Sequence, residues 1–263
     1  MAVCVLLSGA VSGNTANPAG VVAPPPEFRL VRLAYRDNSL GFGGGFGRGG
    51  GRGGGAWTTD APEAEFHLSH GIRRLTRIDT FDPGDYADQD DVFPVRPDDP
   101  EIFKYPFLYA VEVGRWALDE VEAANLREYL LRGGFLMVDD FHGDEQWEGF
   151  WTSMQRVFPD RQWQEIPPDH EVLHVVYDLD EKVQIPGIAA LRTGQTCEQC
   201  NRGGLDPHWR GLFDDKGRLM VAINFNMDLG DAWELADEPD YPQPYTALAY
   251  RFGISYAIYA MSH

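Results

Sequence analysis

A strand–helix–strand pattern between residues 105 and 138 places the strongest constraint on the fold. The run YPFLYAVEVG (105–114) is almost continuously apolar and has the length of a strand covered on both faces. Asp119 and Glu122 have the spacing of a capping box, which predicts a helix start, and two glycines end that helix before the apolar run 135–138. Strands joined in this way form a βαβ unit, so we expect them to lie parallel in an α/β domain.

The rest of the chain supplies further segments of helix or strand length. The segments predicted as strands are 27–36, 170–179 and 219–225. The segments predicted as helices are 61–78, 147–158 and 245–263, and the long loops are 79–100 and 192–209. Together they predict a single three-layer α/β domain over residues 27–263, with a mostly parallel sheet.

Residues 1–26 differ in character from this domain. They open with a short apolar stretch, become small and polar, and end in three prolines. This order is typical of an export signal, although the usual basic leader is missing, so an uncleaved hydrophobic tail is the alternative. We therefore expect an exported protein, periplasmic or associated with the envelope. The chain has no run of about 20 apolar residues, so we expect no transmembrane helix of its own.

A glycine-rich loop at 41–55 follows the first predicted strand. Eleven of its residues are glycine, and it carries Arg48 and Arg52. Such a composition is typical of a flexible linker, and it has no defined phosphate-binding pattern between strand and helix. The alternative is a loop whose two arginines contact a protein partner.

The charge of the chain excludes two classes of partner. Its 41 acidic residues against 22 basic ones give a formal net charge of −19. Non-specific nucleic-acid binding and attachment to anionic lipid both require a cationic surface. We therefore expect no nucleic-acid partner.

Polar side chains follow two of the predicted strands at the point where each ends. The strand 135–138 leads into Asp139, Asp140 and His142. The strand 219–225 carries or leads into a second set, namely Asn224, Asn226, Asp228 and Glu234. In open α/β sheets, ligands bind at the carboxyl ends of strands. If the two strands are neighbours, these oxygens could surround a divalent cation such as Mg²⁺ or Ca²⁺, or hold a sugar or carboxylate. The structural alternative is that Asp139 caps the next helix and the asparagines hold loop backbone.

The cysteines indicate a local disulfide. Cys197 and Cys200 lie three apart in a loop rich in glycine and proline. A thioredoxin-type site needs the pair at a helix start, and a structural zinc site usually needs a second pair. We therefore expect a disulfide between them, in agreement with export. No GxSxG nucleophile motif is present.

Several segments resemble the bacterial domain-of-unknown-function family 4159. The resemblance is carried by YPFLYAVEVGRWALDEVEAANLREYLLRGGFLMVDDFHG, GRLMVAINFNMDLGDAWELAD, the closing YRFGISYAIYAMSH and WTTDAPEAEFHLSHGIRRLTRI, and it runs from Phe28 to His263. It implies the flavodoxin-like fold of class I glutamine amidotransferases. Those enzymes use a cysteine at a nucleophile elbow, and no residue here matches it. The resemblance therefore supports the architecture and not glutaminase activity.

Two functional hypotheses follow. The first is a non-catalytic binding or scaffolding protein, an exported peripheral subunit of a membrane-associated assembly, with Arg48, Arg52 and Trp57 contacting protein partners. The second is a metal-assisted or acid–base hydrolase, or a binder, for a carbohydrate-like substrate. In it, Asp139 or Asp140 is the base and His142 the acid or a ligand, while the second set holds substrate or cation. Neither hypothesis requires an organic cofactor; a divalent cation is the one candidate.

Overall fold

The computed structural model describes residues 25–37, 55–88, 91–180 and 183–263. Most of the N-terminal tail, and the glycine-rich loop with Arg48 and Arg52, lie outside these ranges. Within the described part, no helix combines the length and apolar character needed to cross a membrane.

A seven-stranded, mostly parallel sheet forms the centre of the domain, which confirms the prediction of an α/β fold. Its strand order is β3-β1-β4-β6-β9-β8-β7. The strands are β1 (Val31–Leu33), β3 (Phe93–Val95), β4 (Phe107–Val111), β6 (Phe135–Asp139), β7 (Gln164–Glu165), β8 (His208–Phe213) and β9 (Leu219–Phe225). Neighbours from β3 to β9 pair in parallel, and β8 is antiparallel to both β9 and β7. A small second sheet pairs β2 (Arg36–Asp37) with β5 (Trp116–Ala117).

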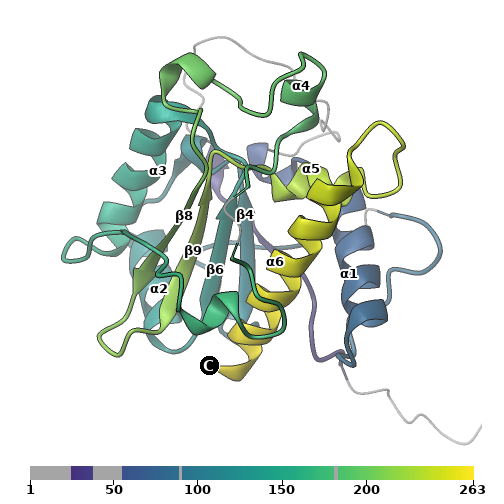
Figure 1. The fold of residues 1–263 in the computed structure, drawn as a ribbon. Coiled ribbons are helices and arrows are strands. Elements are labelled where there is room, and N and C mark those ends of the chain that lie inside the picture. The colour runs from purple at the N-terminus through teal and green to yellow at the C-terminus, as the bar shows by residue number, and fades with distance from the viewer. Residues whose placement is uncertain (1–24, 38–54, 89–90, 181–182) are drawn as a thin grey trace, which may run out of the picture.

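Helices lie on both sides of the sheet (Figure 1). On one side are α2 (Glu120–Leu131) and α3 (Gly143–Val157); on the other are α1 (Glu63–Leu75), α5 (Leu229–Glu234) and α6 (Gln243–Ser262). A short helix, α4, spans Ile188–Leu191. The 3-10 turns are η1 (Ala56–Thr58), η3 (Pro100–Lys104), η4 (Val113–Arg115), η5 (Glu171–Leu173) and η6 (Cys200–Arg202). The pleat of β6 divides its side chains between two hydrophobic cores, with Phe135 and Met137 in one and Leu136 and Val138 in the other.

The predicted βαβ unit consists of β4, α2 and β6. Asp119 caps α2 by accepting from the backbone of Glu122, whose carboxylate accepts from the Asp119 backbone in return. The chain then turns through Gly133, whose φ of 113° is a conformation that favours glycine. Phe107 lies opposite Phe135 in the parallel pairing. The local capping signals and the long-range strand pairing therefore agree.

Three predicted segments were wrong in type or extent. Residues 170–179 form no strand; they contain η5 and loop, and Val172 and Leu173 are buried in the core. The predicted loop 192–209 runs into β8, and the predicted loop 79–100 contains β3. Burial of apolar side chains does not require a strand, and the short edge strands here have too few residues to show a clear period.

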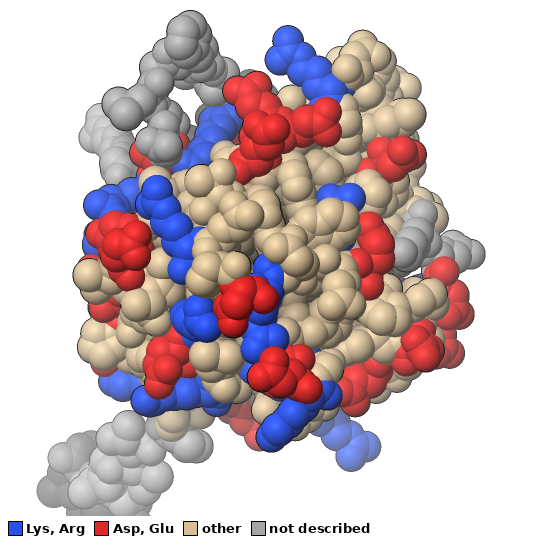
Figure 2. Space-filling view, turned by 90° about the vertical axis from the view of Figure 1, so that its left-hand side faces the viewer, with Lys and Arg blue, Asp and Glu red and all other residues tan. Residues whose placement is uncertain are grey.

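The acidic excess does not gather on the face that carries α2 and α3. Figure 2 shows basic and acidic side chains interspersed there among uncharged residues. On α2, for example, Arg132 pairs with Glu128, and Arg127 pairs with Asp160 beyond the end of α3. Such exposed pairs contribute little to stability, so this face has the mixed charge of an ordinary soluble surface.

Candidate functional site

The two predicted sets of polar residues meet at the carboxyl edge of the sheet. Strands β6 and β9 are parallel neighbours, so their ends lie side by side. The Asp139 carboxylate accepts hydrogen bonds from the backbone N–H groups of Leu229 and Gly230, at 2.7 and 3.0 Å. Asp139 therefore caps α5, the helix after β9, instead of the helix that follows it in sequence.

Asp60 joins these residues from a distant part of the chain. It lies just before α1, and its carboxylate contributes an oxygen to each of two groups of three. The first group is Asp60, Asp140 and Asp228, and the second is Asp60, Asp231 and Glu234. Within each group the three oxygens lie within 4.8 Å of one another. We refer to these residues together with Asp139 as the carboxyl cluster: Asp60, Asp139, Asp140, Asp228, Asp231 and Glu234.

Two buried oxygens of the carboxyl cluster have no hydrogen-bond donor among the described residues. They are Oδ2 of Asp60, a residue 5% exposed, and Oδ1 of Asp139, which is fully buried. A buried carboxylate oxygen without a donor costs free energy. These two oxygens are therefore available to a ligand.

Burial and mutual repulsion raise the pKa values of this cluster. Burial, followed by the charges of neighbouring carboxylates, raises the pKa values of Asp60, Asp140 and Asp228 well above their usual range. Burial raises the pKa of Asp139 to about 7, although its backbone donors oppose the shift. Burial and the neighbouring Asp231 raise the pKa of Glu234 to about 7. Carboxylates so close together cannot all ionise unless a cation compensates them.

The nearby guanidinium of Arg32 compensates the carboxyl cluster only in part. Arg32 is buried in a bidentate pair with Glu65. It also donates to the backbone oxygens of Trp57 and Thr59, at 2.9 and 2.5 Å. Burial and the neighbouring carboxylates raise the pKa values of Asp60 and Glu234 by more than the charge of Arg32 lowers them, so the carboxyl cluster keeps a negative excess.

His142 lies beside the cluster and pairs with Asp140. Its Nε2 is 3.1 Å from Asp140 Oδ1, and its buried Nδ1 has no hydrogen-bond partner in the described part of the chain. Burial lowers the pKa of His142, so the ring is neutral at pH 7. A neutral imidazole next to a carboxyl group can take or pass a proton.

A comparison with protein-family models shows the family of this chain. The model of a family described as Domain of unknown function (DUF4159) matches residues 45–261. The chain belongs to the DUF4159 family. No curated protein matches its sequence.

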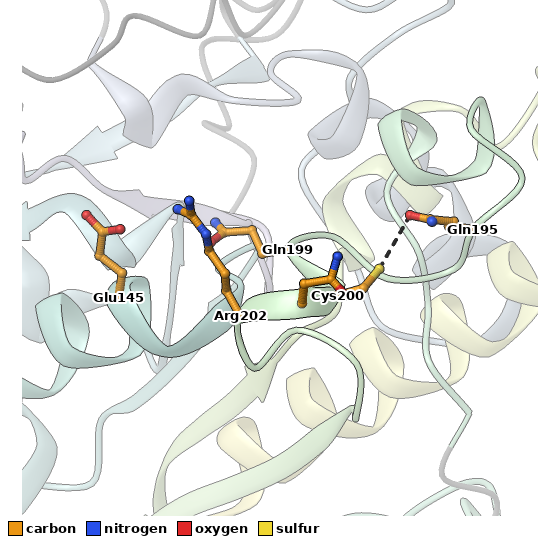
Figure 3. A pocket seen from close by; sticks show the side chains of 6 residues that line it. Glu145, Gln195, Gln199, Cys200 and Arg202 are labelled. Carbon is orange, nitrogen blue, oxygen red and sulfur yellow. Dashed lines mark hydrogen bonds between the residues drawn. The ribbon is translucent and has the colours of Figure 1, made fainter.

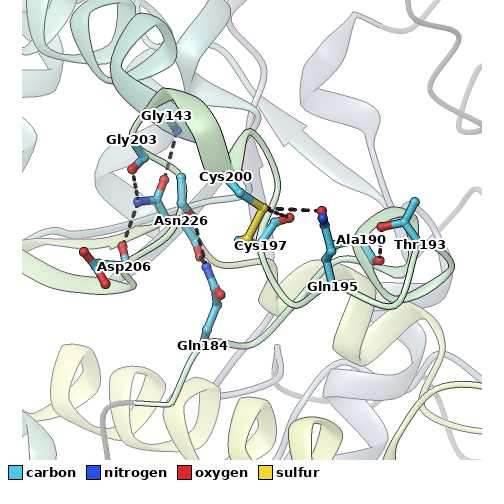
Figure 4. The surroundings of a disulfide bond; sticks show 11 residues. Gly143, Gln184, Ala190, Thr193, Gln195, Cys197, Cys200, Gly203, Asp206 and Asn226 are labelled. Carbon is cyan, nitrogen blue, oxygen red and sulfur yellow. Dashed lines mark hydrogen bonds between the residues drawn. A yellow bond between two sulfur atoms is a disulfide. The ribbon is translucent and has the colours of Figure 1, made fainter.

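In this DUF4159 chain the asparagines at the end of β9 bind backbone and side chains of the fold. Asn224 donates to Val138 O and accepts from the Tyr256 hydroxyl. Asn226 accepts from the Gly143 N–H and donates to two carbonyls of the loop after η6 (Figure 4). Asp228 caps α5 through one oxygen, which accepts from the Asp231 N–H. Of this predicted set, Asp228 and Glu234 reach the carboxyl cluster.

The remaining candidates are placed as follows. Trp57 lies in η1, where its carbonyl accepts from Arg32 and its side chain packs against the second core. Cys197 and Cys200 form a disulfide. Arg48 and Arg52 lie outside the described residues.

Sequence reasoning missed Asp60 and Asp231. Asp60 stands in the WTTDAPEAEF segment, where it reads as a turn residue before a helix, and no local signal connects it to strand ends 80 residues further along. Asp231 does have a signal, because it lies three residues after Asp228 and therefore on the same side of a short helix.

The backbone is unusual at the same edge. All non-glycine residues with positive φ among the described ranges belong to this part of the molecule: Asp60, Glu112, Asp140, Gln199 and Asn226. Left-handed conformations of such residues cost free energy and concentrate at functional sites in proteins. The strained positions and the buried charges thus coincide.

Proposed function

We propose that this DUF4159 chain binds a divalent cation, Mg²⁺ or Ca²⁺, in the carboxyl cluster and uses it to hold a polar, carbohydrate-like substrate for hydrolysis. The observation that carries the proposal is the buried Asp60 Oδ2, which has no donor among the described residues and belongs to a side chain shared by two carboxyl triads. Hard divalent cations prefer carboxylate oxygens, which are the donors present here. A bound cation would displace the protons that the carboxyl groups otherwise hold, or would offset the repulsion between their charges.

The residues around the cluster suit acid–base work. A cation there would polarise an oxygen of a bound substrate. Asp140 and His142 are within hydrogen-bond reach of each other, so one can position or deprotonate the other. Asp139 accepts from the N-terminal N–H groups of α5, which hold its carboxylate in place. It therefore suits a positioning role better than that of a mobile base.

The finer architecture and the location belong to the same proposal. We infer a flavodoxin-like, three-layer domain related to class I amidotransferases, with helices on both sides of a mostly parallel sheet as support. Both cysteines among the described residues are in the disulfide, so neither can act as an amidotransferase nucleophile. A disulfide persists in an oxidising compartment, which supports export to the periplasm or envelope.

The scaffolding hypothesis stays a prediction. Of its partner-contact residues, Arg48 and Arg52 lie outside the described ranges. Trp57 is held in η1 and half-buried, so its ring offers a limited surface to a partner. No contact among the described residues favours a particular protein partner, so the cation site is the function to test first.

Isothermal titration calorimetry with the full chain tests the proposal. After treatment with EDTA and desalting, the protein is titrated with CaCl₂ and with MgCl₂. We expect saturable binding of at least one ion. Asp140→Asn and Asp228→Asn should weaken it by at least about tenfold, because each removes a charged ligand. Asp240→Asn, which changes an exposed aspartate, is the matched control. Wild-type protein that binds neither ion at millimolar concentration would refute the proposal.

The substrate class needs a second measurement. A panel of oligosaccharides is incubated with the protein in calcium or magnesium and, in parallel, in EDTA. We expect new reducing ends only in the presence of the ion, and none with Asp140→Asn. Cation binding with no sugar affinity and no product would leave a cation site and remove the hydrolase part of the proposal.

A further inference from the structure

The loop that contains the disulfide covers one side of the carboxyl cluster. Asn226, at the end of β9, donates to Gly203 O and Asp206 O, at 2.8 and 2.7 Å (Figure 4). Gln184 donates to Gly204 O and to Asn226 O, at 3.2 and 3.0 Å. The later half of the loop is therefore attached to the sheet edge by side-chain hydrogen bonds.

The two residues between the cysteines point in different directions. Gln199 packs against Gly143 at the start of α3, where a Cβ atom on that glycine would lie 3.2 Å from Gln199 Cβ. Glu198 points toward the carboxyl cluster. A Cβ atom at Gly187 would lie 2.6 Å from Glu198 Oε1, 2.7 Å from Asp228 Oδ2 and 3.2 Å from Asp231 Oδ2. Three carboxylate oxygens thus lie next to Gly187, where any side chain would collide with them, and Glu198 Oε1 adjoins oxygens of two cluster members.

We propose that Glu198 is a further ligand of the cation site and that the Cys197–Cys200 disulfide holds it there, so that reduction of the disulfide weakens cation binding. This inference rests on the proposed function, since it concerns the same site. Asp228 and Asp231 belong to the two triads that share Asp60, and Glu198 adjoins both of them. A carboxylate from a covering loop adds charge to the ligand set and fixes the loop when the ion is bound.

The disulfide is well placed to hold Glu198. It closes a ring over a sequence separation of three, and Gln199 within that ring has a φ of 49°, which a non-glycine residue adopts at a cost. The Gln199 carbonyl accepts from the N–H groups of Arg202 and Gly204, at 2.7 and 3.2 Å. Without the covalent link only non-covalent contacts hold the turn, so we expect Glu198 to move away from the cluster more often.

A reductant can reach the disulfide from the side of Cys200. Cys200 is half-buried and lines a surface pocket together with Glu145, Gln195, Gln199, Asn201 and Arg202 (Figure 3). A dithiol would donate two electrons to the sulfur–sulfur bond. The products are two cysteine thiols and the oxidised, disulfide form of the reductant, so the exchange is balanced.

Calcium titration calorimetry on four forms of the full chain tests the inference. They are the oxidised wild type, the wild type reduced with dithiothreitol and desalted without oxygen, Cys197→Ser/Cys200→Ser, and Glu198→Gln. We expect the last three to bind Ca²⁺ about tenfold more weakly than the first. Reducing Glu198→Gln should weaken it no further, because its carboxylate is already absent. Glu145→Gln, in the adjoining pocket, is the control and should bind like the wild type.

The outcomes separate the two proposals. If oxidised wild type binds no calcium or magnesium, the proposed function fails and this inference fails with it. If it binds, but the reduced and double-serine forms agree with it within twofold, the inference alone is overturned. Should the double-serine variant not fold, judged by its thermal transition, the reduced wild type and Glu198→Gln still decide between these results.

Discussion

Replacing Asp60 by asparagine should have opposite effects on stability with and without a cation. In EDTA at pH 8 the carboxyl cluster carries repulsion that no ion relieves. The oxygens within each triad lie within 4.8 Å of one another, and two charges at that distance repel by about 3 kcal/mol at an effective dielectric constant of about 20. Partial protonation reduces that cost, so we expect Asp60→Asn to raise the melting temperature in EDTA by at least about 2 °C.

In calcium the order should reverse. An ion at a hundredfold excess over its dissociation constant stabilises the folded wild type by about 2.7 kcal/mol. For a chain of this size that corresponds to a rise of about 5 to 10 °C in melting temperature. Asp60→Asn removes the ligand shared by both triads, so we expect its melting temperature to rise by less than about 2 °C.

Differential scanning fluorimetry of both proteins, each in EDTA and in 5 mM CaCl₂ or MgCl₂, measures these melting temperatures. The chosen ion concentration is on the order of the dissociation constants of the weakest extracellular calcium sites. Asp240→Asn, an exposed position, should follow the wild type in all buffers. The reasoning is refuted if Asp60→Asn is destabilised in EDTA and gains as much from the ion as the wild type does. That result would mean that Asp60 is a structural residue of the turn before α1.

Further predictions concern pH, packing and ion choice. Asp139 has a pKa of about 7 in the folded protein and an ordinary one when unfolded, so its contribution to stability is complete below about pH 4 and is lost as pH rises through 7. Between pH 4 and 8, the free energy of unfolding of the wild type in EDTA, measured with urea, should therefore fall by up to about 4 kcal/mol more than that of Asp139→Asn. Gly230→Ala should lower the free energy of unfolding, measured in urea, by about 1–3 kcal/mol. It should also weaken calcium binding, because its methyl group would collide with Asp60 Oδ2. Calorimetry should show tighter binding of Ca²⁺ than of Mg²⁺, because a buried, irregular set of oxygens suits calcium, whereas Mg²⁺ retains several waters.

The sequence could predict where the polar residues gather because that signal was local to two long, buried strands. The runs that became β6 and β9 are apolar except for one residue each, Asp139 at the end of β6 and Asn224 next to the end of β9. The helix between β4 and β6 predicted those two strands as parallel, whereas the pairing of β6 with β9 was a condition of the prediction that the structure meets. Asp139, Asp140 and Asp228 could be found in this way.

The rest of the site depends on contacts that no local pattern encodes. Asp60 reaches the edge because Arg32, in β1, binds backbone oxygens of η1 and the turn that precedes Asp60. Glu198 reaches it from a loop that the sequence describes only as rich in glycine and polar residues. The strand predicted at 170–179 failed for a related reason: Val172, Leu173 and Leu179 are buried against the core instead of within the sheet, and Val176 is exposed.

The carboxyl edge is the place where this sequence departs from local consistency. Elsewhere the choices agree, as in the capping box of α2 and the alternation of β6 between two cores. At the edge, buried carboxyl groups, left-handed aspartate and asparagine residues, and glycines that admit carboxylate oxygens occur together. Each of these features lowers stability when the protein is alone, and a chain selected for stability alone would replace them with apolar or paired residues. One divalent cation would offset the charge, provide a partner for the unsatisfied oxygens and hold the strained turns, which is why we interpret all three features as parts of a single ligand site.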